Sequence, residues 1–130
     1  MSTKKVLSLG QCSADHYSIS SLLHRQLGAE VVAVDTFDAA AAELRRGGFD
    51  LVLVNRVLNR DGSSGLEAIA ELKRDESLAQ VPVMLVSNHR DAQEQAAALG
   101  ALPGFGKSSL GSPQTVARLR TALGGGRADQ

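Results

Sequence analysis

The sequence contains few of the residues that several classes of protein require. It has a single cysteine, Cys12, no tryptophan, and only 3% aromatic residues. One cysteine can form neither an intramolecular disulfide nor a cysteine-rich zinc site, which favours a reducing, cytoplasmic location. The scarcity of aromatic rings leaves few surfaces on which bases, sugars or flavins could stack.

Net charge and long apolar runs are lacking as well. The 14 lysines and arginines balance the 14 aspartates and glutamates, so the chain has no charge excess that would attract nucleic acid. No apolar run approaches the ~20 residues that a membrane-spanning helix needs. No glycine-rich phosphate loop follows the first apolar segment. We therefore expect no nucleic acid, membrane or dinucleotide as a partner.

What is present is an alternation of two patterns over 130 residues, a length that suits one domain. Short, mostly apolar segments predict strands, and amphipathic segments between them predict helices. The predicted strands cover residues 4–9, 29–34, 50–54, 81–86 and 101–106, and the predicted helices 14–27, 37–46, 65–74, 91–99 and 114–123. We assign a domain to residues 1–123 and a flexible tail to residues 124–130.

Helix-capping residues support these boundaries. Ser13 is the expected cap of the first helix, Asp35 or Thr36 of the second, and Ser112, followed by Pro113, of the last. The connections are too long for hairpins, so the strands are expected to form a parallel α/β sheet with helices on both faces. Ligands of such sheets bind beyond the carboxyl ends of the strands. The residues at these ends are Gly10, Gln11, Asn55, Ser87 and Lys107.

These positions resemble the receiver domain of two-component response regulators, a CheY-like, flavodoxin-like fold whose five parallel strands have the order 2-1-3-4-5. In that family, the third strand ends in a phosphoacceptor aspartate and leads to an Asp-Gly pair, here Asp61-Gly62. The fourth strand ends in serine or threonine, here Ser87, and the fifth in lysine, here Lys107. The resemblance covers nearly the full chain.

The chain departs from the family at the residues that carry its chemistry. The acid pair that holds magnesium in the family falls on Gly10 and Gln11, and the phosphoacceptor position is Asn55. Magnesium is normally held through one or two carboxylates, so we expect its binding to be weak or absent. An amide oxygen is a poor nucleophile where a carboxylate would attack. The resemblance therefore implies a pseudo-receiver without the usual phosphorylation and without enzymatic activity.

Two further departures concern the conformational switch of the family. The switch aromatic falls on Gly104, one residue before Phe105, and Ser108 replaces the proline that usually follows the lysine in a cis bond. Lys107 is expected to point into the strand-end crevice and to bond the side chain of Asn55 or Asp61. Ser87 is expected to cap nearby backbone, a task that Asn88 or Asp91 could share.

Other residues near the crevice allow two interpretations each. Cationic side chains in its loops could attract an anion or be solvated charges; they are Arg56, Arg60, His89 and Arg90. Cys12 and His16 stand one helical turn apart, but a phosphatase-like loop would place an arginine at position 18, which is serine. We therefore interpret Cys12 as a small buried residue.

Three functions follow from the sequence. The first is a pseudo-receiver that binds a protein partner, such as a histidine kinase, an output domain or a second copy, through about Asp91–Leu123, with Leu102 and Leu110 as contact candidates. The second is a sensor of an anion or a nucleotide-type small molecule that uses the strand-end crevice. The third is a receiver that is phosphorylated on another acid, for which Asp61 is the candidate.

Overall fold

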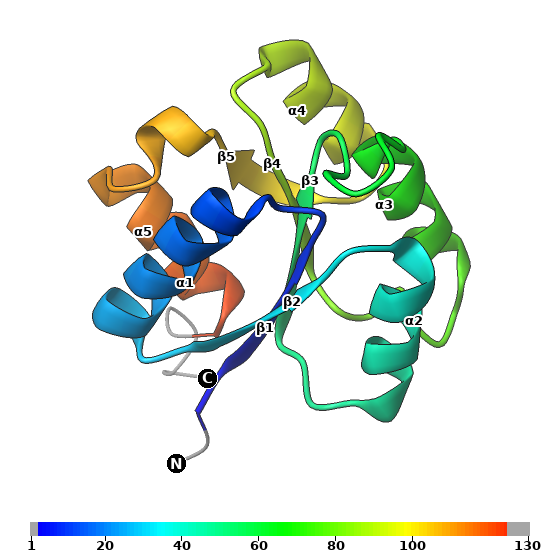
Figure 1. The fold of residues 1–130 in the computed structure, drawn as a ribbon, viewed down its shortest axis with the longest axis horizontal. Helices are drawn as coiled ribbons and strands as arrows, with labels where there is room; N and C mark the ends of the chain where they lie inside the picture. The colour runs from blue at the N-terminus through cyan, green and yellow to red at the C-terminus, as the bar shows by residue number, and fades with distance from the viewer. Residues whose placement is uncertain (1–2, 125–130) are drawn as a thin grey trace.

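The computed structural model describes residues 3–124, whose strands form one parallel sheet (Figure 1). The strand order is β2-β1-β3-β4-β5, and each neighbouring pair is parallel. The strands are β1 (Lys5–Leu9), β2 (Glu30–Val34), β3 (Leu51–Asn55), β4 (Val83–Val86) and β5 (Leu102–Phe105). The predicted flavodoxin-like, doubly wound sheet in the order 2-1-3-4-5 is confirmed.

A helix follows each strand, as the alternating patterns predicted. The helices are α1 (Ser13–Leu27), α2 (Phe37–Arg46), α3 (Gly65–Arg74), α4 (Arg90–Ala98) and α5 (Pro113–Ala122), and a short 3-10 turn, η1 (Lys107–Ser109), precedes α5. Helices α1 and α5 cover one face of the sheet, and the other three cover the opposite face (Figure 1). No helix within residues 3–124 is long and apolar enough to cross a membrane.

The sheet is buried on both faces, which explains why its strands are continuously apolar. In β3, Leu51 and Leu53 pack against α1 and α5, whereas Val52 and Val54 pack against the other three helices. All four side chains are fully buried. The two apolar layers hold the strands in register, so the residues that follow β1, β3, β4 and β5 meet at one end of the sheet.

Several predicted boundaries shift by a few residues, each for a local reason. Cys12, and not Ser13, caps α1: its Sγ accepts a hydrogen bond from Asp15 N at 3.5 Å. Cys12 is also partly exposed and so is not the buried residue that we expected. Thr36 and Ser112 cap α2 and α5 as predicted. Strand β4 begins only at Val83 because Pro82 has no N–H to donate.

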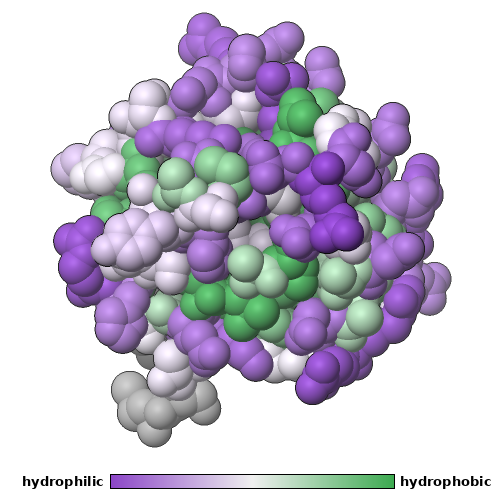
Figure 2. Space-filling model, viewed as in Figure 1, coloured by the Kyte–Doolittle hydropathy of each residue, from purple (hydrophilic) through white to green (hydrophobic). Residues whose placement is uncertain are grey.

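The two edges of the sheet differ in composition. Strand β2 is a valine-rich edge, and Figure 2 shows a hydrophobic area over it, between α1 and α2. Its three valines are half-buried: Val31, Val32 and Val34. The β5 edge contains Pro103, which cannot donate to a further strand. The predicted tail lies mostly in residues 125–130, outside the described residues.

Candidate functional site

The strand-end residues meet in a small pocket at the carboxyl end of the sheet. The pocket has a volume of about 190 Å³, and its lining combines the ends of β3 and β4 with Lys107, just after β5; the residues are Asn55, Arg56, Val57, Val86, Ser87, Asn88, His89 and Lys107. The structure thus brings together four of the predicted site residues. Gly10, Gln11, Asp61 and Gly62 do not line this pocket, although Gly62 lines an adjacent one.

Asn55, the last residue of β3, is fixed by bonds to backbone. Its side-chain nitrogen donates to Gly10 O at 3.1 Å and to Val57 O at 2.8 Å. Both partners are acceptors, so the NH₂ group of the carboxamide must face them. The residue is only 9% exposed. An aspartate at this position could not make these bonds, because a carboxylate has no hydrogen to donate.

The positions that correspond to the family's acid pair hold no carboxylate, and one of them has a backbone conformation that favours glycine. Gly10 has a φ of 81°, and a Cβ at this residue would overlap the side chain of Leu58. An aspartate at position 10 would therefore require Leu58 to shift and would have to adopt a backbone conformation that favours glycine. Gln11 is 8% exposed, and within residues 3–124 neither its side-chain oxygen nor its nitrogen has a hydrogen-bond partner.

Lys107 does not bond Asn55 or Asp61, and that prediction is wrong. Its Nζ lies 2.7 Å from Asp15 Oδ2, and both side chains are about one-third exposed. The hydrogen bond from Lys107 is the largest cause that lowers the pKa of Asp15 below its usual range. Asp15 lies in the first turn of α1, where an acid favours the helix N-terminus. Sequence reasoning missed this residue, although α1 was predicted to begin just beyond β1.

Asp61 is engaged within its own loop. Its Oδ1 accepts hydrogen bonds from Ser63 N at 2.9 Å and from Ser63 Oγ at 2.7 Å. These bonds lower the pKa of Asp61, and the residue is exposed. The Asp-Gly pair therefore serves a turn in this structure: Gly62 has a φ of 73°, which favours glycine.

Ser87 caps nearby backbone, as predicted. Its Oγ accepts a hydrogen bond from His89 N at 3.0 Å. Asn88 links β4 to η1, because its Oδ1 accepts from Ser108 N at 3.2 Å and from Ser108 Oγ at 2.9 Å. Asp91 Oδ1 accepts a hydrogen bond from the adjacent Ala92 N and bonds neither Ser87 nor Asn88. All peptide bonds among the described residues are trans, including the one before Ser108.

No side chain fits at Gly104, the position of the family's switch aromatic. A Cβ there would overlap the carbonyl oxygen of Leu85 on the neighbouring strand β4. Phe105 cannot replace the aromatic, because its side chain is buried between the sheet and α1 and α5. Gln93 and Arg118 instead tie the helices to β4 and β5: Gln93 Nε2 donates to Leu85 O at 2.9 Å, and Arg118 donates to Gly104 O at 2.7 Å.

The residues at the strand ends do not fit a magnesium ion. Within residues 3–124, no group of three or more His, Cys, Asp or Glu side chains is placed to hold a metal. The amide NH₂ of Asn55 faces Gly10 O and Val57 O, so these two oxygens already have a donor. Magnesium would also lack the carboxylates that normally hold it.

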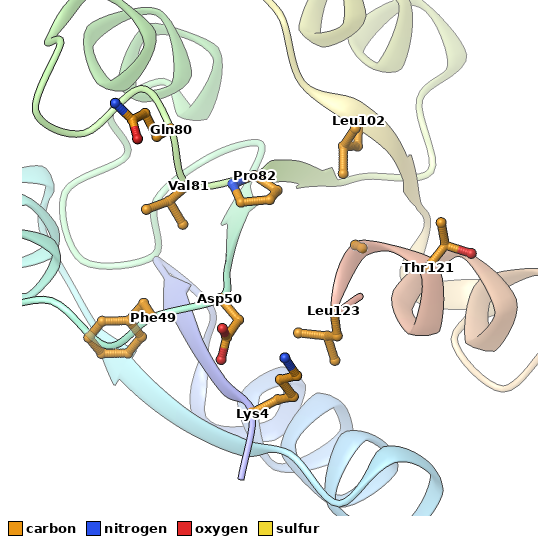
Figure 3. Close-up of a pocket in the computed structure, with 10 residues that line it drawn as sticks. Lys4, Phe49, Asp50, Gln80, Val81, Pro82, Leu102, Thr121 and Leu123 are labelled. Carbon is orange, nitrogen blue, oxygen red and sulfur yellow. The ribbon is translucent and has the colours of Figure 1, made fainter. Parts of the chain in front are cut away.

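A larger hollow, of about 600 Å³, lies at the opposite end of the sheet (Figure 3). Lys4 and Asp50 contribute its charged groups, and Phe49, Leu102 and Leu123 contribute apolar surface. Asp50 Oδ2 accepts from Lys5 N at 2.9 Å and so connects the starts of β3 and β1. Sequence reasoning did not predict this hollow, since its lining comes from segments far apart in the chain.

A parallel sheet in this order, covered by helices on both faces, is the CheY-like form of the flavodoxin-like fold. A family model described as "Response regulator receiver domain" matches residues 14–104. The chain therefore belongs to the response regulator receiver domain family. A comparison with curated proteins finds no match.

Solved structures agree with this fold. The BeF3-activated receiver domain of RstA from Klebsiella pneumoniae is 22% identical, with a TM-score of 0.77 over 92% of this chain and 98% of that one. The receiver domain of the sensor histidine kinase PA1611 from Pseudomonas aeruginosa, solved with magnesium in its cleft, is 21% identical, with a TM-score of 0.68 over 95% and 96%. CheY4 of Vibrio cholerae is 17% identical, with a TM-score of 0.68 over 94% and 99%.

Proposed function

We propose that this receiver domain is not phosphorylated at the usual position and acts in two-component signalling by binding another protein. One observation carries the proposal: the side chain at the phosphoacceptor position, Asn55, is a neutral carboxamide that donates both of its bonds to backbone. A carboxamide is a poor nucleophile for phosphoryl transfer. We also propose that the domain has no enzymatic activity, and its cytoplasmic location stays a prediction.

The surroundings of Asn55 support the same proposal. Lys107, which contacts the phosphoryl group in the family, is paired with Asp15. The absence of carboxylates at positions 10 and 11 removes the groups that would hold magnesium beside a phosphoryl group. Phosphorylation at this site would thus lack both a carboxylate nucleophile and a bound metal. Lys107 would also have to break its ion pair with Asp15 before it could contact a phosphoryl group.

The surface formed by α4, β5 and α5 is the proposed binding face. Leu99 and Leu102 are exposed on it, at 37% and 39%. A groove of about 280 Å³ runs between the β5 edge and α5, and its lining is mainly apolar: Met84, Leu102, Pro103, Ala117, Arg118, Thr121 and Ala122. Exposed apolar patches often mark protein interfaces. Leu110, the other predicted contact, packs against the core and is a weaker candidate.

Phosphorylation can be tested on the purified protein with Mg²⁺ and acetyl phosphate, and separately with beryllofluoride. Intact mass is expected to show no added phosphoryl group, and the two-dimensional amide NMR spectrum is expected not to change. An Asp61→Asn variant, treated in parallel, separates the third function. Phosphorylation of the wild-type protein that Asp61→Asn abolishes would assign the chemistry to Asp61 and contradict the proposal.

Binding can be tested by NMR titration with purified histidine kinase and output domains and by sedimentation of the domain alone. Leu102→Glu, which places a charge on the proposed face, is expected to weaken a detected association at least about tenfold. Tyr17→Glu is the matched control, because Tyr17 is 73% exposed and lies on α1, which is not part of the proposed face. Equal loss in both variants would contradict the assignment of the face.

Anion sensing is a second candidate, favoured by the lining of the crevice pocket. Three of its residues are cationic or can become so, Arg56, His89 and Lys107, and none is acidic. A ligand of the folded state raises the melting temperature, so phosphate, nucleotides and cyclic dinucleotides can be compared by thermal melting. A rise that Arg56→Ala abolishes would support sensing, and no rise with any of these ligands would exclude them.

A further inference from the structure

We propose that the carboxamide of Asn55 holds together the carboxyl ends of β1 and β3 by filling a position that would otherwise need a cation. This inference deepens the proposed function. It rests on that function because it assumes that the wild-type site works without a metal. It goes further by assigning Asn55 a structural role that an aspartate could take over only with a bound cation.

The geometry places one donor group between two oxygens from different segments. Nδ2 of Asn55 lies 3.1 Å from Gly10 O, beyond the end of β1, and 2.8 Å from Val57 O, in the loop after β3. Each of the two amide hydrogens of Asn55 can serve one oxygen. The side chain therefore connects residues 45 positions apart in the chain.

The backbone around this group leaves it little freedom to move. Gly10 O also accepts from Asn59 N at 2.9 Å, and Gly65 N donates to Arg56 O at 2.7 Å. A Cβ at Gly65 would overlap Asn55 O, so the start of α3 is packed directly on the end of β3. Gly10 O thus has Asn59 N as a second donor, whereas Val57 O accepts its hydrogen bond from the Asn55 side chain.

Replacing Asn55 by aspartate would change the chemistry of this position with little change in size. The two donated hydrogens would be lost, and a carboxylate oxygen would face two carbonyl oxygens. These oxygens repel one another when no cation is present. A hard cation such as Mg²⁺ can bind carboxylate and carbonyl oxygens while it retains several waters. The variant is therefore expected to depend on a cation that the wild-type protein does not need.

Thermal melting of three proteins in EDTA and in about 10 mM Mg²⁺ tests the inference. In EDTA, Asn55→Asp and Asn55→Ala are each expected to melt about 5 °C or more below the wild type, because Val57 O loses the bond from Asn55 and Gly10 O keeps only the bond from Asn59 N. Magnesium is expected to restore at least about half of the loss in Asn55→Asp. It should change the wild type and Asn55→Ala by less than about 1 °C, since neither has a carboxylate there.

Folding itself provides the readout if Asn55→Asp is unfolded in EDTA. Circular dichroism should then show that Mg²⁺ restores the helical signal in this variant. If Asn55→Asp is as stable as the wild type in EDTA, or if Mg²⁺ leaves its reduced stability unchanged, the inference is wrong, and the proposed function is untouched. If the wild type is stabilised by Mg²⁺ or gains a phosphoryl group, the proposed function fails as well.

Discussion

At the carboxyl end of β3, the side chains bond to the chain itself, whereas on the face formed by α4, β5 and α5, apolar side chains remain exposed. Asn55 donates hydrogen bonds to Gly10 O and Val57 O, and Lys107 pairs with Asp15. Leu99 and Leu102, in contrast, each expose more than a third of their surface.

Under the proposed function, this difference separates phosphorylation from partner binding. In the crevice, Asn55 and Lys107 are engaged in internal bonds. The proposed binding face exposes apolar side chains. Between the two regions, Gln93 bonds the backbone of β4 and Arg118 bonds the backbone of β5.

The largest expected effect comes from restoring the family's aromatic residue at position 104. Gly104→Phe is expected to lower the free energy of unfolding by about 3 kcal/mol or more, because its Cβ would overlap Leu85 O. Urea denaturation measures the loss. The control is Gly111→Ala, where a Cβ meets open space, and a change within about 0.5 kcal/mol is expected. Similar stability of both variants would show that β4 and β5 can separate.

A smaller effect is expected when the tie between α4 and β4 is removed. Gln93→Leu loses the bonds from Nε2 to Leu85 O at 2.9 Å and to Ser87 O at 3.1 Å. We expect a loss of about 1–2 kcal/mol in urea denaturation, since the carbonyl oxygens lose their donor. Gln95→Leu, at an exposed position of the same helix, should change stability by less than about 0.5 kcal/mol. An equal loss of stability in Gln93→Leu and Gln95→Leu would contradict a connection between α4 and β4 through Gln93.

The ion pair between Lys107 and Asp15 should contribute less, because both side chains are partly exposed. We expect a coupling energy of about 0.5–1 kcal/mol at neutral pH in a double-mutant cycle with Lys107→Met and Asp15→Asn. The folded protein lowers the pKa of Asp15 below its ordinary value of 3.8. The stabilisation is therefore full above that value and is lost as the pH falls through the lower, folded pKa.

Denaturation of the four proteins at neutral and at strongly acidic pH measures this dependence, and NMR titration of the Asp15 carboxyl provides a direct check. Lys107→Met should raise the pKa of Asp15 toward its ordinary value, because its largest lowering contact is removed. A coupling energy that stays constant down to strongly acidic pH would contradict this pairing.

The smallest effect on stability is expected on the proposed binding face. Leu102→Ser should change the free energy of unfolding by no more than about 0.5 kcal/mol, because Leu102 is exposed. Leu110→Ser, which removes a partly buried side chain from the core, should cost about 1 kcal/mol or more. Thermal melting of the two variants compares the positions. If Leu102→Ser is destabilised more than Leu110→Ser, Leu102 stabilises the fold. Its exposure then does not indicate a binding face for a partner.

The fold could be predicted from the sequence because its signals are local. Continuous apolar residues in 51–54 indicate a strand buried on both faces, and Thr36, Ser112 and Pro113 mark helix starts. The positions of the candidate site could be predicted for a similar reason, because each residue lies at or just beyond the carboxyl end of a strand. Asn55, Arg56, Ser87 and Lys107 do meet in one pocket.

The partners within the site could not be predicted, because they depend on approaches between distant segments. Lys107 bonds Asp15, 92 residues earlier in the chain, and no local pattern distinguishes this acid from Asp61. Leu58 fills the space beside Gly10, so the loss of the acid there involves the loop after β3. The cap of α1 was misplaced because Ser13 is a better capping residue than Cys12 in general, although the helix begins one residue earlier.

The covering of β1 by α5 has a consequence for the order in which the chain can fold during synthesis. Val6, in β1, shares an apolar cluster with Leu119 in α5 and with Leu123 just beyond it. A nascent chain can pair β1 with β2 and β3 early, but this face stays partly uncovered until α5 emerges from the ribosome. Exposed apolar strands promote aggregation of incomplete chains. The final turns of α5 therefore complete the protection of β1, which is synthesised before them.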